Sequence, residues 1–347
     1  MDNLTINIGQ LQSVASVYAN VSKGLLEFNR RWASGHKVSV TWDMTNLTSG
    51  HINMTAASFF LAIAHRVRLF TEQRQPIRID WHPKQFSFLA DIGFFKISNE
   101  YDLFDWPFEI GGYEINTINP NTKILAFDQI YSSPNYSDSH EVAEWKKVHR
   151  EQYRREIINR CESLLSVSES YLGRDLPLIM SRTCAELVTN SLLWGNSTSF
   201  LALQRSKKSI SISVIDIGRG FRSSLGQKSD MLNINTSLLD DISSIAIGSI
   251  INQNDFGLKR AISTVIELDG TISITSNSGE IHWANDSWQK YLHFLYDYNI
   301  ESAISSLPTP IKKSTSQDRE NGYTRTWNNS IRGTRIEFNI PLREKFY

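Results

Sequence analysis

The chain has 347 residues, of which 40% are hydrophobic and 21% are charged. This composition can bury sizeable cores and excludes a chain that is disordered overall. The length is enough for two domains of ordinary size. The 36 basic and 36 acidic side chains balance to a formal net charge of zero, which argues against a strongly basic nucleic-acid-binding protein.

The N-terminus, the apolar segments and the two cysteines favour a cytoplasmic protein. Residues 1–5 carry no basic cluster and no apolar core, so they lack the pattern of a secretory signal. The most apolar run, residues 56–64, is far shorter than the roughly 20 residues of a membrane span. Cys161 and Cys184 are more typical of buried cytosolic thiols than of one disulfide. We therefore expect a cytoplasmic location, with neither membrane nor nucleic acid as a partner.

The first third of the chain alternates the patterns of helices and strands. Residues 55–71 are apolar on nearly every face, which is typical of a buried helix. The predicted elements are a helix at 11–32, a strand at 37–42, a helix at 55–71, a strand at 77–81 and a helix at 83–90. This rhythm predicts a small α/β domain with an N-terminal helix, to which we assign residues 1–135.

A polar stretch and a long charged helix follow. Residues 132–139 include Pro134 and predict a loop or linker. The helix predicted at 141–166 has a broad apolar stripe, which predicts packing within the chain or in a homodimer. Its basic residues are mixed with acids, which predicts a solvated face. These residues are Lys146, Lys147, Arg150, Arg154 and Arg155. We assign residues 136–175 to this connecting helix.

An apolar helix predicted at 177–194 carries an acid and an amide four residues apart. Glu186 and Asn190 share one helical face, because residues i and i+4 are neighbours on a helix. A carboxylate can take a proton, and an amide oxygen can bind a hard cation such as Mg²⁺. Gly195 is predicted to end this helix. The pair indicates one half of a nucleotide site.

A strand that runs into a glycine turn indicates the other half. Residues 209–216 read as a strand that ends at Asp216, with residues 200–204 as its hairpin partner. Gly218 and Gly220 follow, and glycine allows positive φ and a close approach of the backbone.

The last third contributes three further predicted elements. They are a helix at 257–268, a strand at 271–276 and a terminal strand at 333–341. Residues 221–254 form a long, mostly polar segment, and an apolar patch at 245–251 predicts a short helix within it. Connections of this length are usually functional, so we expect the segment to close over a bound ligand as a lid.

These motifs resemble, in the same order, those of the GHKL superfamily. Its members include ATPase domains of type II topoisomerases, heat-shock chaperones and mismatch-repair proteins, sensor histidine kinases and anti-sigma-factor kinases. The resemblance covers residues 176–342 and implies a two-layer α/β sandwich over residues 176–347 that binds ATP and Mg²⁺. The motifs are E-x-x-x-N (Glu186 and Asn190), D-x-G-x-G (Asp216, Gly218 and Gly220), the end of a second glycine box (Gly257 and Leu258) and G-T (Gly333 and Thr334).

The resemblance implies how the base of the nucleotide would be held. Asp216 would accept a hydrogen bond from the amino group of adenine, and Thr334 would lie beside it. Gly218 and Gly220 would let the backbone come close to the base.

The resemblance also implies how the phosphates would be held. Asn190 would be a ligand of Mg²⁺, and Glu186 would activate the nucleophile that attacks the γ-phosphate. Gly257 and Leu258 would open a helix whose first amides meet phosphate.

Two departures limit these implications. The second glycine box usually reads G-x-G-L-G-L, but residues 253–258 read Gln-Asn-Asp-Phe-Gly-Leu. Asp255 would repel phosphate, so adenine binding is a firmer expectation than turnover. His140 begins a match to the H-E-x-x-x-P box of histidine kinases, but Trp145 occupies the proline position. An active histidine kinase is therefore the least favoured alternative.

The N-terminal domain resembles a STAS-like domain, the fold of anti-sigma-factor antagonists. The resemblance lies in the strand near Val38, the helix from Thr55, the strand near Ile77 and the segment at 89–95. It implies a protein partner for this domain.

The leading hypothesis is a regulatory protein with slow ATPase or protein-kinase activity of the anti-sigma-kinase type. The alternative is a non-catalytic ATP-sensing module that switches the binding of a protein partner.

Overall fold

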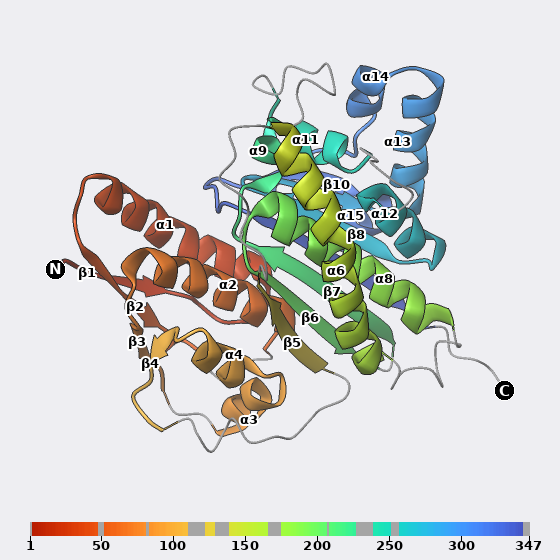
Figure 1. The fold of residues 1–347 in the computed structure, drawn as a ribbon. Coiled ribbons are helices and arrows are strands. Elements are labelled where there is room, and N and C mark those ends of the chain that lie inside the picture. The colour runs from red at the N-terminus through yellow and green to blue at the C-terminus, as the bar shows by residue number, and fades with distance from the viewer. Residues whose placement is uncertain are drawn as a thin grey trace. The chain divides into compact units, whose positions relative to one another are not determined.

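The computed structural model describes residues 2–47, 52–80, 83–109, 122–128, 139–165, 175–206, 208–226, 239–250 and 257–342. The fold is mixed α/β, with one parallel and one antiparallel sheet (Figure 1). The chain divides into two compact units. The first contains Met1–Ala126, Phe200–Gln204 and Asn329–Ile331, and the second contains Phe127–Ser199, Arg205–Asn328 and Arg332–Tyr347. None of the helices in the described residues has the length and apolar character that a membrane span requires.

The first unit is built on a parallel sheet with the strand order β1-β2-β3-β4. The strands are β1 (Asp2–Asn7), β2 (Val38–Asp43), β3 (Gln75–Arg78) and β4 (Phe104–Asp105), and the helices are α1 (Val14–Ala33), α2 (Met54–Thr71), α3 (Pro83–Asp91) and α4 (Phe94–Glu100). Parallel neighbours need crossover connections, and the helices supply them. Helix α2 is buried along most of its length, which confirms the prediction of a buried helix.

The first unit has an aromatic core. Phe60 lies 5.2 Å from Trp42 and 5.4 Å from Phe104, measured between ring centroids. Strand β1 was not predicted, because only one of its six residues is buried and an edge strand of that kind lacks the alternation that identifies strands.

The second unit places helices against an antiparallel sheet. Its helices are α6 (Ser139–Leu165), α8 (Asp175–Asn190), α9 (Gly220–Gly226), α11 (Asp241–Gly248), α12 (Leu258–Glu267), α13 (Asn285–Asp297), α14 (Ile300–Ser305) and α15 (Ser316–Asn321). Helix α6 packs along α8, α8 contacts β7, and α12 contacts β8 and β11. Helix α6 therefore belongs to the packed body of this unit.

Within the second unit the strand order of this sheet is β10-β9-β8-β11-β7. These strands are β7 (Ser209–Asp216), β8 (Thr271–Ser276), β9 (Gly279–Trp283), β10 (Tyr323–Thr326) and β11 (Thr334–Pro341). The remaining strands, β5 (Thr122–Phe127) and β6 (Ser199–Arg205), fall mostly in the segments of the first unit. Strand β11 pairs antiparallel with both β7 and β8. Along β11, Ile336, Phe338 and Ile340 are buried, as expected for a strand with one face on a core.

The predicted strands at 209–216 and 271–276 coincide with β7 and β8, and the terminal strand begins one residue later than predicted. The short helix predicted from the patch at 245–251 is α11, which begins earlier, at Asp241, because Asp240 caps it by accepting a hydrogen bond from the amide of Ser243. Residues 132–138 of the predicted linker lie outside the described residues, and α6 starts at Ser139.

Candidate functional site

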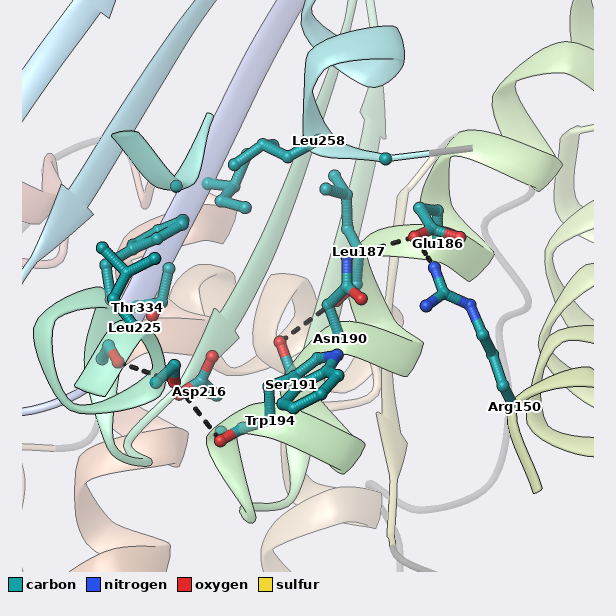
Figure 2. Close-up of a pocket in the computed structure, with 17 residues that line it drawn as sticks. Arg150, Glu186, Leu187, Asn190, Ser191, Trp194, Asp216, Leu225, Leu258 and Thr334 are labelled. Atoms are coloured by element: carbon teal, nitrogen blue, oxygen red, sulfur yellow. Dashed lines mark hydrogen bonds and ion pairs between the residues drawn. The ribbon is translucent and has the colours of Figure 1, made fainter. Parts of the chain in front are cut away.

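The second unit contains a pocket where α6, α8, α9, α12 and the ends of β7 and β11 meet (Figure 2). Its volume, including the solvent at its mouth, is about 860 Å³, which is within the range of sites for small organic ligands. The lining residues are Arg150, Glu186, Leu187, Asn190, Ser191, Trp194, Gly195, Asp216, Gly220, Phe221, Ser224, Leu225, Gly248, Gly257, Leu258, Thr334 and Ile336. The pocket thus brings together residues from all four motifs of the sequence.

The acid and the amide of α8 lie on one face, as predicted. The side-chain nitrogen of Asn190 donates a hydrogen bond of 3.3 Å to Oε1 of Glu186. Glu186 is only 3% exposed, so its carboxylate is largely removed from water. Burial raises the pKa of Glu186 above its ordinary value, and nearby arginines oppose this shift only in part.

Two arginines of α6 face this carboxylate. Arg150 forms an ion pair with Oε1 of Glu186, and Nε of Arg154 lies 3.7 Å from Oε2. The two arginine side chains are 15% and 13% exposed. The prediction of a solvated basic face is therefore wrong for Arg150 and Arg154. The contact was not visible in the sequence, because α6 and α8 are separate segments whose packing brings the charges together.

Asp216 ends β7 in a buried position at the glycine turn. It is 3% exposed, and its Oδ1 accepts a hydrogen bond of 2.8 Å from the amide of Gly218. Burial raises the pKa of Asp216 to about 6, and hydrogen bonds from Gly218, Ser191 and Thr334 oppose this shift. A carboxylate held in this way can accept a hydrogen bond from a ligand amine at neutral pH.

The sheet register places Thr334 directly opposite Asp216. The residue before it, Gly333, has φ +117°, and a Cβ there would lie 2.1 Å from the carbonyl oxygen of Asp216. Glycine is therefore required where β11 begins. The G-T pair and the aspartate are parts of one junction.

The two glycines of the turn, Gly218 and Gly220, are required for different structural reasons. Gly220 has φ +73°, in the region that glycine favours. Gly218 is not in that region; a Cβ at Gly218 would lie 2.2 Å from the carbonyl oxygen of Gly195. The turn is thus pressed against Gly195, which also accepts a hydrogen bond of 3.1 Å from the amide of Arg219.

A π-helical turn, η2 (Ser191–Gly195), continues α8 beyond Asn190. Such turns insert one residue into a helix and are frequent at functional sites. Its residues Ser191, Trp194 and Gly195 line the pocket. Sequence reasoning missed this group, although its position directly after the E-x-x-x-N motif was a signal that could have indicated it.

Helix α12 begins at Leu258, with Gly257 as the extended residue before it. Gly257 thus precedes a helix, as predicted, and both residues line the pocket. Residues 253–256, including Asp255, lie outside the described residues. The same holds for residues 227–238 and 251–254 of the predicted lid, and for the side chain of His140.

The pocket has two chemically different ends. Figure 2 shows Asp216 and Thr334 on one side, Glu186 and Arg150 on the other, and Asn190 between them. No group of three or more His, Cys, Asp and Glu side chains that could hold a metal is present within the described residues. A Mg²⁺ ion at Asn190 therefore fits only if a ligand supplies further oxygens, as phosphates do.

Comparisons of the chain with models of known protein families, with curated proteins and with solved structures found no match.

Proposed function

We propose that the second unit is a GHKL-type ATP-binding domain, joined to a STAS-like first unit, in a cytoplasmic regulatory protein. The observation that carries the proposal is the convergence of four separated motifs on one pocket. Glu186 comes from α8, Asp216 from β7 and Thr334 from β11, and all three line one cavity, as a nucleotide site requires.

The adenine end is the better supported part. The carboxylate of Asp216 would accept a hydrogen bond from the amino group of the base. Trp194, Phe221 and Leu258 line the same pocket and offer apolar surface to a base. The raised pKa of Asp216, about 6, leaves it mostly ionised at neutral pH.

At the other end, Asn190 would bind Mg²⁺ together with phosphate oxygens. Glu186 would take the proton of a water molecule or a protein hydroxyl. The oxygen of that water or hydroxyl would form a bond to the γ-phosphorus. The bond between that phosphorus and the β–γ bridging oxygen would break, and ADP would leave. Oε2 of Glu186 would take this proton, because it accepts no hydrogen bond from the described residues, although Nε of Arg154 lies 3.7 Å away. The activity proposed is slow ATP hydrolysis or phosphoryl transfer to a protein, of the anti-sigma-kinase type.

The alternative function, a non-catalytic ATP sensor, is favoured by the ion pair between Arg150 and Glu186. A carboxylate held by a guanidinium is a weaker base. In that case the nucleotide only changes the affinity for a protein partner of the first unit.

The central test is a calorimetric titration of Mg·ATP into the parent chain and the Asp216→Asn variant. We expect binding by the parent and at least a tenfold weaker affinity in the variant, because an amide does not replace the charged acceptor. Asp297→Asn is the matched control, since Asp297 is an exposed acid of α13. No binding by the parent would refute the proposal.

A turnover assay distinguishes an ATP-consuming enzyme from a non-catalytic ATP sensor. If the protein is an enzyme, Glu186→Ala lowers phosphate release or phosphotransfer by a factor of about 100 or more while ATP binding persists. A parent chain that binds ATP but never exceeds the background rate is a sensor.

A further inference from the structure

The two arginines that face Glu186 differ in one respect. Arg150 lines the pocket and Arg154 does not. Both come from α6, one helical turn apart, and both have largely buried side chains. Both members of the ion pair between Arg150 and Glu186 therefore line the pocket, and a ligand in the pocket can reach the guanidinium of Arg150.

A polyphosphate would change the charge balance around Arg150. Without a ligand, Glu186 neutralises its guanidinium. A nucleoside triphosphate brings several negative charges into the same pocket, and phosphate oxygens match the fork of N–H donors on arginine. Lysine at this position would offer a point charge without the fork.

The reach of Arg150 follows from its contact with Glu186. If Glu186 activates a nucleophile, the attacking oxygen lies between the carboxylate of Glu186 and the phosphorus under attack. Arg150 already touches Oε1 of that carboxylate. A terminal phosphate beside Glu186 would therefore lie near the guanidinium of Arg150.

We propose that Arg150 recognises the terminal phosphate of a bound nucleoside triphosphate, and that its ion pair with Glu186 is the resting position of this side chain. This inference rests on the proposed function. Binding of a triphosphate transfers Arg150 from Glu186 to phosphate and releases the carboxylate. A diphosphate has no group at that place and leaves the ion pair intact. Arg154, which does not line the pocket, keeps its place beside Glu186.

The test compares Mg·ATP with Mg·ADP in calorimetric titrations of the full chain. The variants are Arg150→Ala, Arg150→Lys and, as the matched control from the same helix, Arg154→Ala. We expect Arg150→Ala to weaken ATP binding at least tenfold while ADP binding changes by less than threefold. Arg150→Lys recovers part of the ATP affinity, and Arg154→Ala leaves the ATP-to-ADP affinity ratio unchanged.

Results that contradict the role of Arg150 can be distinguished from results that contradict the proposed function. Equal losses for ATP and ADP in Arg150→Ala, or a loss of the ratio in Arg154→Ala, overturn the role of Arg150 while the nucleotide site stands. A parent chain that binds neither nucleotide overturns both. If Arg150→Ala does not fold, Arg150→Gln is measured in its place and decides by the same ratio.

Discussion

Two buried glutamates of the second unit have similar surroundings and different properties. Glu186 of α8 is 3% exposed and Glu280 of β9 is 2% exposed. Each lies within 4 Å of two arginines, Arg150 and Arg154 for Glu186, and Arg325 and Arg335 for Glu280. Only Glu186 lines the pocket.

The difference lies in the donors around each carboxylate. Oε1 of Glu280 accepts from the hydroxyl of Tyr323 at 3.0 Å, and Oε2 accepts from Arg325 at 2.7 Å and from the indole of Trp327 at 2.9 Å. Burial pushes the pKa of Glu280 upward, but these donors and the arginines outweigh it, so the pKa is lowered. Around Glu186 burial prevails and the pKa is raised. A fully bonded carboxylate holds a fold together, and an incompletely bonded one beside a cavity is available for chemistry.

The largest expected effect is on stability. Replacing Glu280 by glutamine leaves Arg325 and Arg335 buried without their counter-charge, so we expect the free energy of unfolding to fall by about 3–5 kcal/mol. The matched change Glu186→Gln also leaves Arg150 and Arg154 without their counter-charge. It removes a carboxylate whose charged form burial disfavours, however, so we expect these two effects to offset each other and the free energy of unfolding to stay within about 1 kcal/mol of the parent. Urea unfolding followed by circular dichroism measures both. Equal losses would contradict the contrast.

A smaller effect isolates one donor. Tyr323→Phe removes the hydroxyl that donates to Glu280, and hydrogen bonds to charged groups contribute about 1.5–3 kcal/mol. We expect that loss in the unfolding free energy and no change in the affinity for Mg·ATP. A weaker nucleotide affinity in a folded Tyr323→Phe variant would show that the Glu280 cluster acts on the pocket, and the two regions would no longer be separate.

The smallest effect concerns pH. The folded-state pKa of Asp216 is raised from 3.8 to about 6, so the buried charge costs stability above that pH and protonation relieves the cost. Without nucleotide, the parent should therefore gain about 1 kcal/mol of stability relative to Asp216→Asn as the pH falls from about 7 to about 5. Glu280 is silent in this window, because a lowered pKa removes stability only below the ordinary value of 4.5. The affinity for ATP should move in the opposite direction, since a protonated Asp216 has lost its charge and is a weaker hydrogen-bond acceptor for the amino group of the base.

In that pH experiment, stability is measured by urea unfolding at each pH and affinity by calorimetry. Parallel pH trends for stability and affinity would exclude Asp216 as the acceptor for the base.

Part of the pocket could be predicted from the sequence because the signals of the residues concerned are local. Glu186 and Asn190 are four residues apart on one helix, and Asp216 is followed at once by its glycines. The place of Thr334 beside Asp216 was implied only by the family resemblance, and the register of β11 on β7 puts the two residues opposite each other. A glycine that is required by a close backbone contact can be recognised in the sequence as part of a motif.

The charge pairs were not predictable, because their partners are distant in sequence. Glu280 and His282 alternate with apolar residues along β9, which is the pattern of a solvated sheet face, and the donors to Glu280 come from the neighbouring β10 and from Trp327 beyond it. Arg150 and Arg154 lie among exposed charges of α6. In both places tertiary packing decides which charged side chains are buried, and the local sequence pattern does not indicate which ones they are.

The place of β11 in the sheet has a consequence for the order of folding. This strand inserts between β7 and β8, although both precede it in the chain. Helices α6 and α8 are local structures, but pairings across such long sequence separations form slowly. A nascent chain that has not yet reached β11 lacks the Gly333–Thr334 junction beside Asp216. The pocket is therefore completed late, and the ability to bind a ligand there distinguishes finished molecules from partly folded ones.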